Sequence, residues 1–410
     1  AGHHALVLAD YEWGARLQGA GDQDLAPGDA GALRFLLVEQ LDHLSATEVA
    51  TWLQAQEERE TAELNGAHAA AAGIRNPRAS VDWPEFAAAI ARIHQSIGEG
   101  ETYQVNYTYR LDFQACGSPA ALYRRLRARQ PVAFGAYIAL PEGEPVSHIL
   151  SCSPELFLRH QGGQLVARPM KGTSCRSPVP EGDSELARLL AEDVKNRAEN
   201  LMIVDLLRND LGRIARTGSV RVPALFSVEP YATLFQMTST VEAELPTTTT
   251  FPAVLRALFP CGSIAGAPKL FTMQIIRAIE STPRGLYTGS IGWIDAPGPD
   301  RATAACGDFC LSVAIRTLTL GPSADGIRAG QMGVGAGIVI DSVAADEFAE
   351  CALKARFLTG LLPSGEAPTT CPAPAERSGS DGAERRTARP SAAHAAPART
   401  ASATVPASKP

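Results

Sequence analysis

The sequence lacks any uninterrupted apolar run of about 18 residues, and its first residues do not combine a basic segment with a long apolar one. The first absence argues against a membrane-spanning helix, and the second argues against a secretory signal. Acidic residues outnumber basic ones by 44 to 37, which gives a formal net charge of −7. Because nonspecific nucleic-acid binding needs a basic surface, we expect a cytoplasmic protein that binds neither nucleic acid nor membrane.

The eight cysteines show none of the spacings that zinc sites or redox pairs require. They form no C-x-x-C pair, and no histidine stands at a zinc-like interval from them. In a cytoplasmic chain such cysteines are usually reduced, buried and inert. The sequence therefore gives no support to a disulfide framework.

Large apolar side chains are almost missing from residues 363–410, where Val405 is the only large aliphatic residue and aromatic residues do not occur. A segment of this composition cannot offset the entropy of ordering by burial. We predict that residues 363–410 form a disordered tail or a linker.

Regular periodicity is clearest from Asp82 onward. Asp82 and Glu85 have the spacing of a capping box, and apolar residues then recur at helical intervals as far as Ile97. Residues 103–113 alternate between apolar and polar, which predicts a strand. Further helices are predicted at Ala46–Leu64, Ser184–Ile214 and Asp346–Leu358.

Several shorter runs predict strands, and one segment is ambiguous. The run Leu33–Leu41 fits a helix or a strand equally well. Strand-like runs mixed with long helices, without regular βα alternation, favour an α+β layered fold over a doubly wound sheet. The predicted strands cover residues 220–222, 233–241, 289–294, 311–320 and 335–340.

Four carboxylate or amine side chains are arranged on two predicted helices. Glu347, Glu350 and Lys354 stand at i, i+3 and i+7 and therefore share one helix face, while Glu199 lies among apolar residues of another helix. Two carboxylates from separate helices would make an oxygen-only site suited to Mg²⁺, which an anionic substrate could complete. The alternative is that these glutamates are solvated, as most helical glutamates are.

A lysine and a small-residue segment offer two more candidate sites. Lys171 follows the strand-like LVARPM and precedes Gly172, so it is a candidate nucleophile or an ordinary surface charge. The segment GVGAGI breaks the templates of NAD and ATP loops. Its small residues predict either a carboxylate-binding turn at Gly335, Ala336 and Gly337 or a tight turn that enters a strand.

These segments together resemble the chorismate-utilising enzyme family, which includes anthranilate, aminodeoxychorismate, isochorismate and salicylate synthases. The resemblance runs from about Trp83 to Leu361. It implies a layered α/β sandwich of two antiparallel sheets packed face to face with outer helices. It also implies a short N-terminal part at residues 1–80 and a chorismate-binding catalytic domain at residues 81–362. The motifs that carry it, in family order, are GETYQVNYT, SPELF, RPMKGT, ENLMIVDLLRNDLGR, FPCGSIAGAPK, YTGSIGW, DFCLSVAIRT and GVGAGIVIDSVAADEFAECALKA.

The resemblance also implies a set of binding residues. Glu199 and Glu350 would bind Mg²⁺, with Glu347 close by, and the metal would hold the ring carboxylate of chorismate. Arg316 and Lys354 would neutralise carboxylates. Further substrate contacts are implied for Gly172, Thr173, Tyr287, Gly335, Ala336 and Gly337.

Two positions point to one branch of the family. Anthranilate synthases resemble this chain but have alanine where Lys171 stands, whereas aminodeoxychorismate synthases have lysine there. Members that add water have lysine at the position of Gln104, and a glutamine cannot serve as the base for water. The resemblance therefore favours the component I chemistry of aminodeoxychorismate synthases. An anthranilate synthase component I and a non-catalytic chorismate-binding subunit remain alternatives.

The implied reaction exchanges the C4 hydroxyl of chorismate for an amino group. Glu155 acts as general acid, Lys171 attacks C2, and ammonia then adds at C4 and expels the lysine. The chain has no G-x-C-x-G elbow followed by an H-x-E pair, so we expect a separate glutamine amidotransferase subunit to supply the ammonia. Gln236 stands where many relatives have histidine, and Ala265 where a hydroxyl residue is common.

Overall fold

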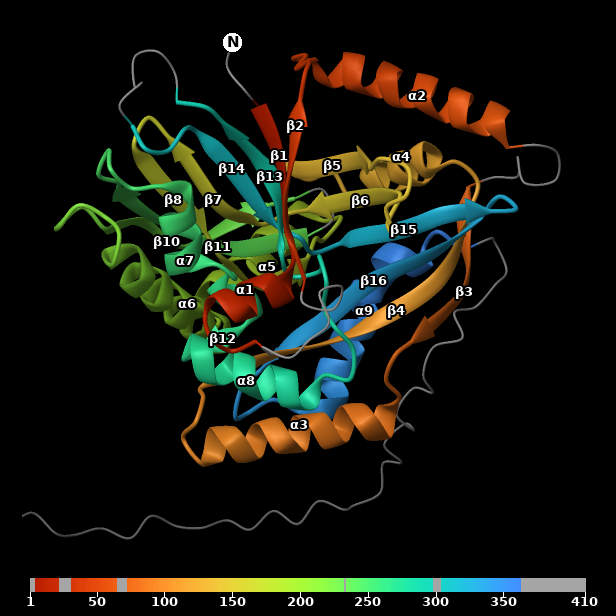
Figure 1. The fold of residues 1–410 in the computed structure, drawn as a ribbon. Coiled ribbons are helices and arrows are strands. Elements are labelled where there is room, and N and C mark those ends of the chain that lie inside the picture. The colour runs from red at the N-terminus through yellow and green to blue at the C-terminus, as the bar shows by residue number, and fades with distance from the viewer. Residues whose placement is uncertain (1–3, 22–30, 65–71, 232–233, 298–303, 363–410) are drawn as a thin grey trace, which may run out of the picture. The chain divides into compact units, whose positions relative to one another are not determined.

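Two antiparallel sheets form the framework of the computed structural model (Figure 1). The structure describes residues 4–21, 31–64, 72–231, 234–297 and 304–362, so the predicted tail at 363–410 lies outside the described residues. The larger sheet contains β1 (His4–Ala9), β2 (Leu33–Val38), β7 (Leu156–Gln161), β8 (Gln164–Arg168), β9 (Met170–Cys175), β10 (Arg221–Pro230), β11 (Leu234–Glu244), β13 (Ser290–Asp295) and β14 (Phe309–Val313). Its order is β10-β11-β8-β7-β14-β13-β1-β2, and β9 pairs with β11.

The smaller sheet is built around one long strand pair. Its order is β12-β4-β16-β15-β6-β5, and β3 also pairs with β4. Segments from the first 80 residues enter both sheets, because β1 and β2 join the larger one and β3 joins the smaller one. The strands are β3 (Gly73–Ala79), β4 (Gln104–Cys116), β5 (Phe134–Ala139), β6 (His148–Ser153), β12 (Gly266–Ala267), β15 (Thr317–Ala324) and β16 (Ile327–Ile338).

One connected hydrophobic core includes side chains from both sheets. Val7 and Leu311 of the larger sheet belong to the same cluster of buried residues as Tyr107, Leu111 and Val334 of the smaller one. Burying such a side chain contributes roughly 1.5–3 kcal/mol relative to leaving it in water. The predicted α+β sandwich of two antiparallel sheets is therefore confirmed.

Three of the predicted helices occur within a residue or two of their expected bounds, and the charged helix α2 (Ala46–Glu63) is one of them. α3 (Trp83–Gly98) begins with the capping box of Asp82 and Glu85 that the sequence predicts. Phe86 of α3 packs against Phe348 with ring centroids 5.0 Å apart. Phe348 lies in α9 (Ala344–Thr359), so α3 and α9 lie side by side (Figure 1).

The remaining helices complete the outer layers. They are α1 (Tyr11–Leu17), α4 (Pro119–Arg129), α5 (Pro180–Glu192), α6 (Val194–Gly212), α7 (Phe251–Leu258) and α8 (Lys269–Ile279), with a short 3₁₀ helix, η2 (Gly262–Ile264). Within the described residues, no helix is both long and apolar enough to cross a membrane.

The single helix predicted from Ser184 to Ile214 is wrong, because α5 and α6 are separate helices. Asp193 stands between them in an extended conformation, with ψ 116°. Its side chain accepts a hydrogen bond from the N–H of Asn196 at 2.7 Å and so caps the start of α6. The apolar pattern continues across the break, and for this reason the periodicity did not indicate two helices.

The single strand predicted at 311–320 is also wrong, because β14 and β15 belong to different sheets. Between them, Arg316 has φ +50°, a left-handed backbone conformation that is uncommon outside glycine. The chain crosses from one sheet to the other there, and apolar residues on both sides concealed the crossing.

We predict that Asp193→Ala lowers the free energy of unfolding by about 1 kcal/mol, because the first turn of α6 loses its side-chain acceptor. Urea unfolding followed by circular dichroism measures the loss. Asp205→Ala removes an exposed carboxylate from the same helix and should change stability by less than about 0.5 kcal/mol. Equal losses in the two variants would contradict the capping role.

Candidate active site

Glu155 is a buried carboxyl group at the junction of β6 and β7. Its side chain is 4% exposed, and its Oε1 accepts a 2.7 Å hydrogen bond from Ser263 Oγ on η2. Burial raises the pKa of Glu155 to about 7, although the Ser263 hydrogen bond and the charges of Lys171 and Arg316 act in the opposite direction. A carboxyl group with this pKa is protonated in about half of the molecules at neutral pH and can donate that proton, which suits a general acid.

Lys171 reaches the same place from β9. The β7–β8 hairpin pairs Leu156 with Arg168, and the chain then continues into β9, so two strands and a turn bring Lys171 near Glu155. Lys171 Nζ lies 3.9 Å from Glu199 Oε2, and both side chains are mostly buried. The amine, the acid and Glu199 therefore belong to one cluster.

The segment Gly335–Gly337 is part of a strand, as the strand predicted at 335–340 indicated, so both predictions of a turn there are wrong. It lies within β16 and pairs with Asn106–Thr108 of β4. Pairing between β16 and β15 ends at Met332, so residues 333–338 pair with β4 alone. The long regular register of β4 and β16 holds the segment extended, although its small residues are typical of turns.

Glycine is required in this strand for close approach. A Cβ at Gly337 would lie 2.4 Å from Gln104 Nε2 and 3.2 Å from Lys171 Nζ, so the amide and the amine both lie over this residue. At Gly335 an added Cβ would come within 2.4 Å of the Tyr107 carbonyl oxygen. The carbonyl oxygen of Gly335 accepts a 2.8 Å hydrogen bond from Lys354 Nζ. Any side chain at 335 or 337 would displace these groups.

Three glutamates from α6 and α9 influence one another across the site. Burial raises the pKa of Glu199, and the nearby charges of Glu347 and Glu350 raise it further. Burial of Glu350 acts to raise its pKa. The charge of Lys354, which forms a 2.7 Å ion pair with Glu350, acts in the opposite direction, and the pKa of Glu350 is lowered overall. The helices thus bring the predicted carboxylates within electrostatic range.

Glu199 and Glu350 fit a magnesium ion better than Glu347 does. Both offer the hard oxygen donors that Mg²⁺ prefers, and a divalent cation would relieve the repulsion between them. Glu347 differs in having a buried hydrogen bond: its Oε1 accepts from Ser342 Oγ at 2.7 Å and lies 3.7 Å from Lys195 Nζ. Glu350 is paired with Lys354, so a metal ion there would share Glu350 with this lysine. Nowhere in the described part of the chain do three His, Cys, Asp or Glu side chains converge as metal ligands. A site here would need oxygens from a ligand.

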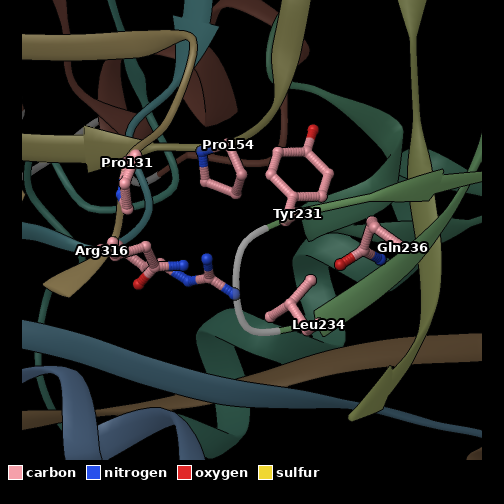
Figure 2. Close-up of a pocket in the computed structure, with 7 residues that line it drawn as sticks. Pro131, Pro154, Tyr231, Leu234, Gln236 and Arg316 are labelled. Atoms are coloured by element: carbon pink, nitrogen blue, oxygen red, sulfur yellow. The ribbon is translucent and has the colours of Figure 1, made fainter. Parts of the chain in front are cut away.

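A small pocket is lined in part by Pro154, the residue before Glu155 (Figure 2). Arg316 extends into it from the crossing between the sheets, and within the described residues its guanidinium forms no hydrogen bond or ion pair. Burial lowers the pKa of Arg316, but a guanidinium stays charged in proteins. A free, buried cation of this kind suits a carboxylate. The lining residues are Gln130, Pro131, Pro154, Tyr231, Leu234, Gln236 and Arg316.

Tyr287 is fixed by a buried charge network behind the site. The Arg110 guanidinium lies 4.9 Å from the centre of the Tyr287 ring and 3.5 Å from Glu280. Glu280 also pairs with Arg284 at 2.6 Å, and Arg284 donates to the carbonyl oxygens of Ile264 and Asn106. The network therefore connects Tyr287 with the loop that carries Ser263.

Sequence reasoning missed Ser263 and gave Gln104 and Gln236 no binding role. Ser263 lies in the motif FPCGSIAGAPK, which supports the resemblance, but this serine was given no role. Gln104 is 1% exposed, and within the described residues neither atom of its amide has a hydrogen-bond partner. An unpartnered buried amide is costly, so its place over Gly337 indicates a group that meets a ligand. No sequence signal identified these contacts, because they depend on the sheet register.

Comparisons with known proteins agree with this geometry. A model of the chorismate binding enzyme family matches residues 2–360, and the chain belongs to that family. It is 44% identical over 269 residues to aminodeoxychorismate synthase of Streptomyces griseus, which covers 65% of this chain and 35% of the relative. It is 40% identical over 273 residues to aminodeoxychorismate synthase component 1 of Klebsiella aerogenes, covering 67% of this chain and 56% of the relative.

A solved structure shares the fold. Anthranilate synthase component I from Streptococcus pneumoniae superposes with a TM-score of 0.68 and 26% sequence identity, covering 87% of this chain and 80% of the other. The chain spans about a third to just over half of the length of the two curated relatives it matches.

We predict that Glu155→Gln changes how stability depends on pH. Between pH 4.5 and about 7 an unfolded chain releases the proton of Glu155 while the folded protein retains it, so rising pH destabilises the native protein. The unfolding free energy of Glu155→Gln minus that of the native protein should therefore rise by up to about 3 kcal/mol across this range. Urea titrations at pH 4.5, 6 and 8 measure it.

The exposed Glu142→Gln is the matched control for this titration. The difference between this variant and the native protein should stay constant with pH. A constant difference for Glu155→Gln as well would contradict the raised pKa.

Proposed function

We propose that this chain converts chorismate and ammonia to 4-amino-4-deoxychorismate, as component I of an aminodeoxychorismate synthase. The observation that carries the proposal is the cluster in which the Lys171 amine lies between Glu199 and Gly337, within electrostatic range of the protonated Glu155. The names of several relatives at 38–44% identity support the same activity. The product would serve 4-aminobenzoate and folate synthesis.

Substrate binding would use the charges around the cluster. Arg316 would neutralise the carboxylate of the enolpyruvyl group in the pocket, and Tyr287 and the open edge of β16 would hold the neighbouring oxygens. Glu199 and Glu350 would hold Mg²⁺, which when bound neutralises the ring carboxylate. Gly172 and Thr173 would border the ring beside Lys171.

The first chemical step would form a covalent adduct. The neutral amine of Lys171 attacks C2, the two ring double bonds shift, and the C4–oxygen bond breaks. Glu155 gives its proton to the departing hydroxyl, which leaves as water. The enolpyruvyl group takes no part, so it stays attached to the ring.

Ammonia would complete the reaction in a second step. Ammonia adds at C4, the double bonds return to their positions, and the bond between C2 and Lys171 breaks to release the amine. A separate glutamine amidotransferase subunit would supply the ammonia; the label "component 1" of one group of relatives supports a second subunit. Gln104 next to Lys171 offers no base for water, which supports addition of ammonia instead.

We predict that Lys171→Ala lowers formation of 4-amino-4-deoxychorismate at least 100-fold while chorismate still binds, because only the nucleophile is lost. The assay combines purified protein, chorismate, Mg²⁺ and ammonium, and an added lyase releases 4-aminobenzoate for detection. Chorismate affinity from calorimetry shows that the site is intact. Unchanged turnover would refute the covalent step, and fluorescent anthranilate from the native protein would favour the anthranilate synthase alternative.

We predict that Glu350→Gln raises at least tenfold the Mg²⁺ concentration needed for half-maximal chorismate binding, because one metal ligand loses its charge. Binding is followed by calorimetry, independently of turnover. Asp346→Asn removes an exposed carboxylate from the same helix and should leave the Mg²⁺ requirement unchanged. If both variants behave alike, Glu350 is not a ligand.

A further inference from the structure

Gln236 connects β11 to the two residues that follow Lys171. It stands opposite Thr173 in the register of β11 and β9 and is 7% exposed. Its Nε2 donates to the carbonyl oxygen of Gly172 at 2.7 Å, and its Oε1 accepts from Thr173 Oγ1 at 3.0 Å. One side-chain amide therefore uses both of its ends on this short segment.

β9 has a single strand partner, and α6 packs against it near Lys171. β9 pairs with β11 alone in the described sheet, and the register shifts between Gln236 and Thr238. Gly172 has φ +82°, and a Cβ there would lie 2.8 Å from the side chain of Asn196. Neighbouring groups cannot hold Gly172 through a side chain, because glycine has none. The hydrogen bond from Gln236 to the carbonyl oxygen of Gly172 is therefore an important restraint on the backbone.

We propose that Gln236 is a positioning residue that fixes the direction of the Lys171 side chain by holding the backbone of Gly172 and the hydroxyl of Thr173. The kinetic part of this inference rests on the proposed function. The amide suits the task because it offers one donor and one acceptor and does not titrate. Shifting a nucleophile by about 1 Å costs up to roughly 100-fold in rate, so losing this restraint should be measurable.

Gln236 also lines the pocket that Arg316 enters, so a direct substrate contact is the competing role (Figure 2). The two roles predict different kinetics. A positioning residue acts on the step that Lys171 performs and changes kcat. A residue that contacts chorismate changes its binding in proportion to the loss of kcat/KM.

The test compares three substitutions at this position. Gln236→Leu removes both hydrogen bonds, and we expect kcat to fall at least tenfold while the Kd of chorismate changes less than threefold. Gln236→Glu keeps an acceptor but loses the donor to Gly172, and it should resemble the leucine variant. Gln236→His offers one donor and one acceptor while neutral and should retain kcat within about threefold above pH 7.

The pH profile of Gln236→His gives a readout that a merely structural role would not change. An imidazolium has two donors and no acceptor, and its charge would lie beside those of Lys171 and Arg316. Below the ordinary imidazole pKa of about 6.5 the activity of this variant should therefore fall. The loss is measured relative to the native protein at each pH, and Gln331→Leu, a strand variant whose Gln331 bonds to exposed Asp112, should show no such additional loss.

A chemical probe tests positioning without relying on turnover. Fluorodinitrobenzene labels lysine amines, and peptide mass spectrometry gives the labelling rate at Lys171 relative to exposed Lys195 in the absence of chorismate. Gln236→Leu should change this ratio at least threefold, whereas Gln331→Leu should not change it. An unchanged ratio together with native kcat would overturn the inference, as would a rise in Kd that accounts for the whole loss of kcat/KM. A native protein that makes no aminodeoxychorismate would instead refute the proposed function.

Discussion

The candidate site depends on the absence of side chains at Gly335 and Gly337. Because Gly337 has no Cβ atom, Lys171 and Gln104 can both lie over it, and Lys354 binds the carbonyl oxygen of Gly335 two residues away. The long register with β4 keeps this stretch extended, and the end of the β15 pairing leaves its other edge open. A side chain at residue 337 would meet both the Lys171 amine and the Gln104 amide, so the two groups could not keep their places.

The charged side chains that meet at this site nearly balance one another. Glu199, Glu347 and Glu350 lie within range of Lys171, Lys195 and Lys354, so carboxylates and amines offset one another. A divalent cation that entered this cluster alone would leave it positively charged. Chorismate has two carboxylates, so the proposed metal and the substrate would each favour the binding of the other.

Much of the fold was predictable because local patterns and tertiary packing agree. The capping box of α3, the alternation in β4 and the helical character of α9 all follow from residue spacing. Predictions failed where an apolar pattern continued through a change of direction, as at Asp193 and Arg316. The family resemblance predicted that Glu155 and Lys171 act on the same substrate. Ser263 and the bonds of Gln236 could not be foreseen, because they depend on which atoms face each other across packed strands.

The crossing from β14 to β15 has a geometric consequence. The N–H of Val313 donates to the carbonyl oxygen of Glu155, and the carbonyl oxygen of Arg316 accepts from the N–H of Cys152. The four residues 313–316 are therefore held by backbone hydrogen bonds at both ends, and they connect the backbone of Glu155 with that of Arg316. In the proposed reaction, this short segment would set the distance between the leaving hydroxyl at Glu155 and the carboxylate at Arg316, so the main chain would contribute to the selection of ligand size.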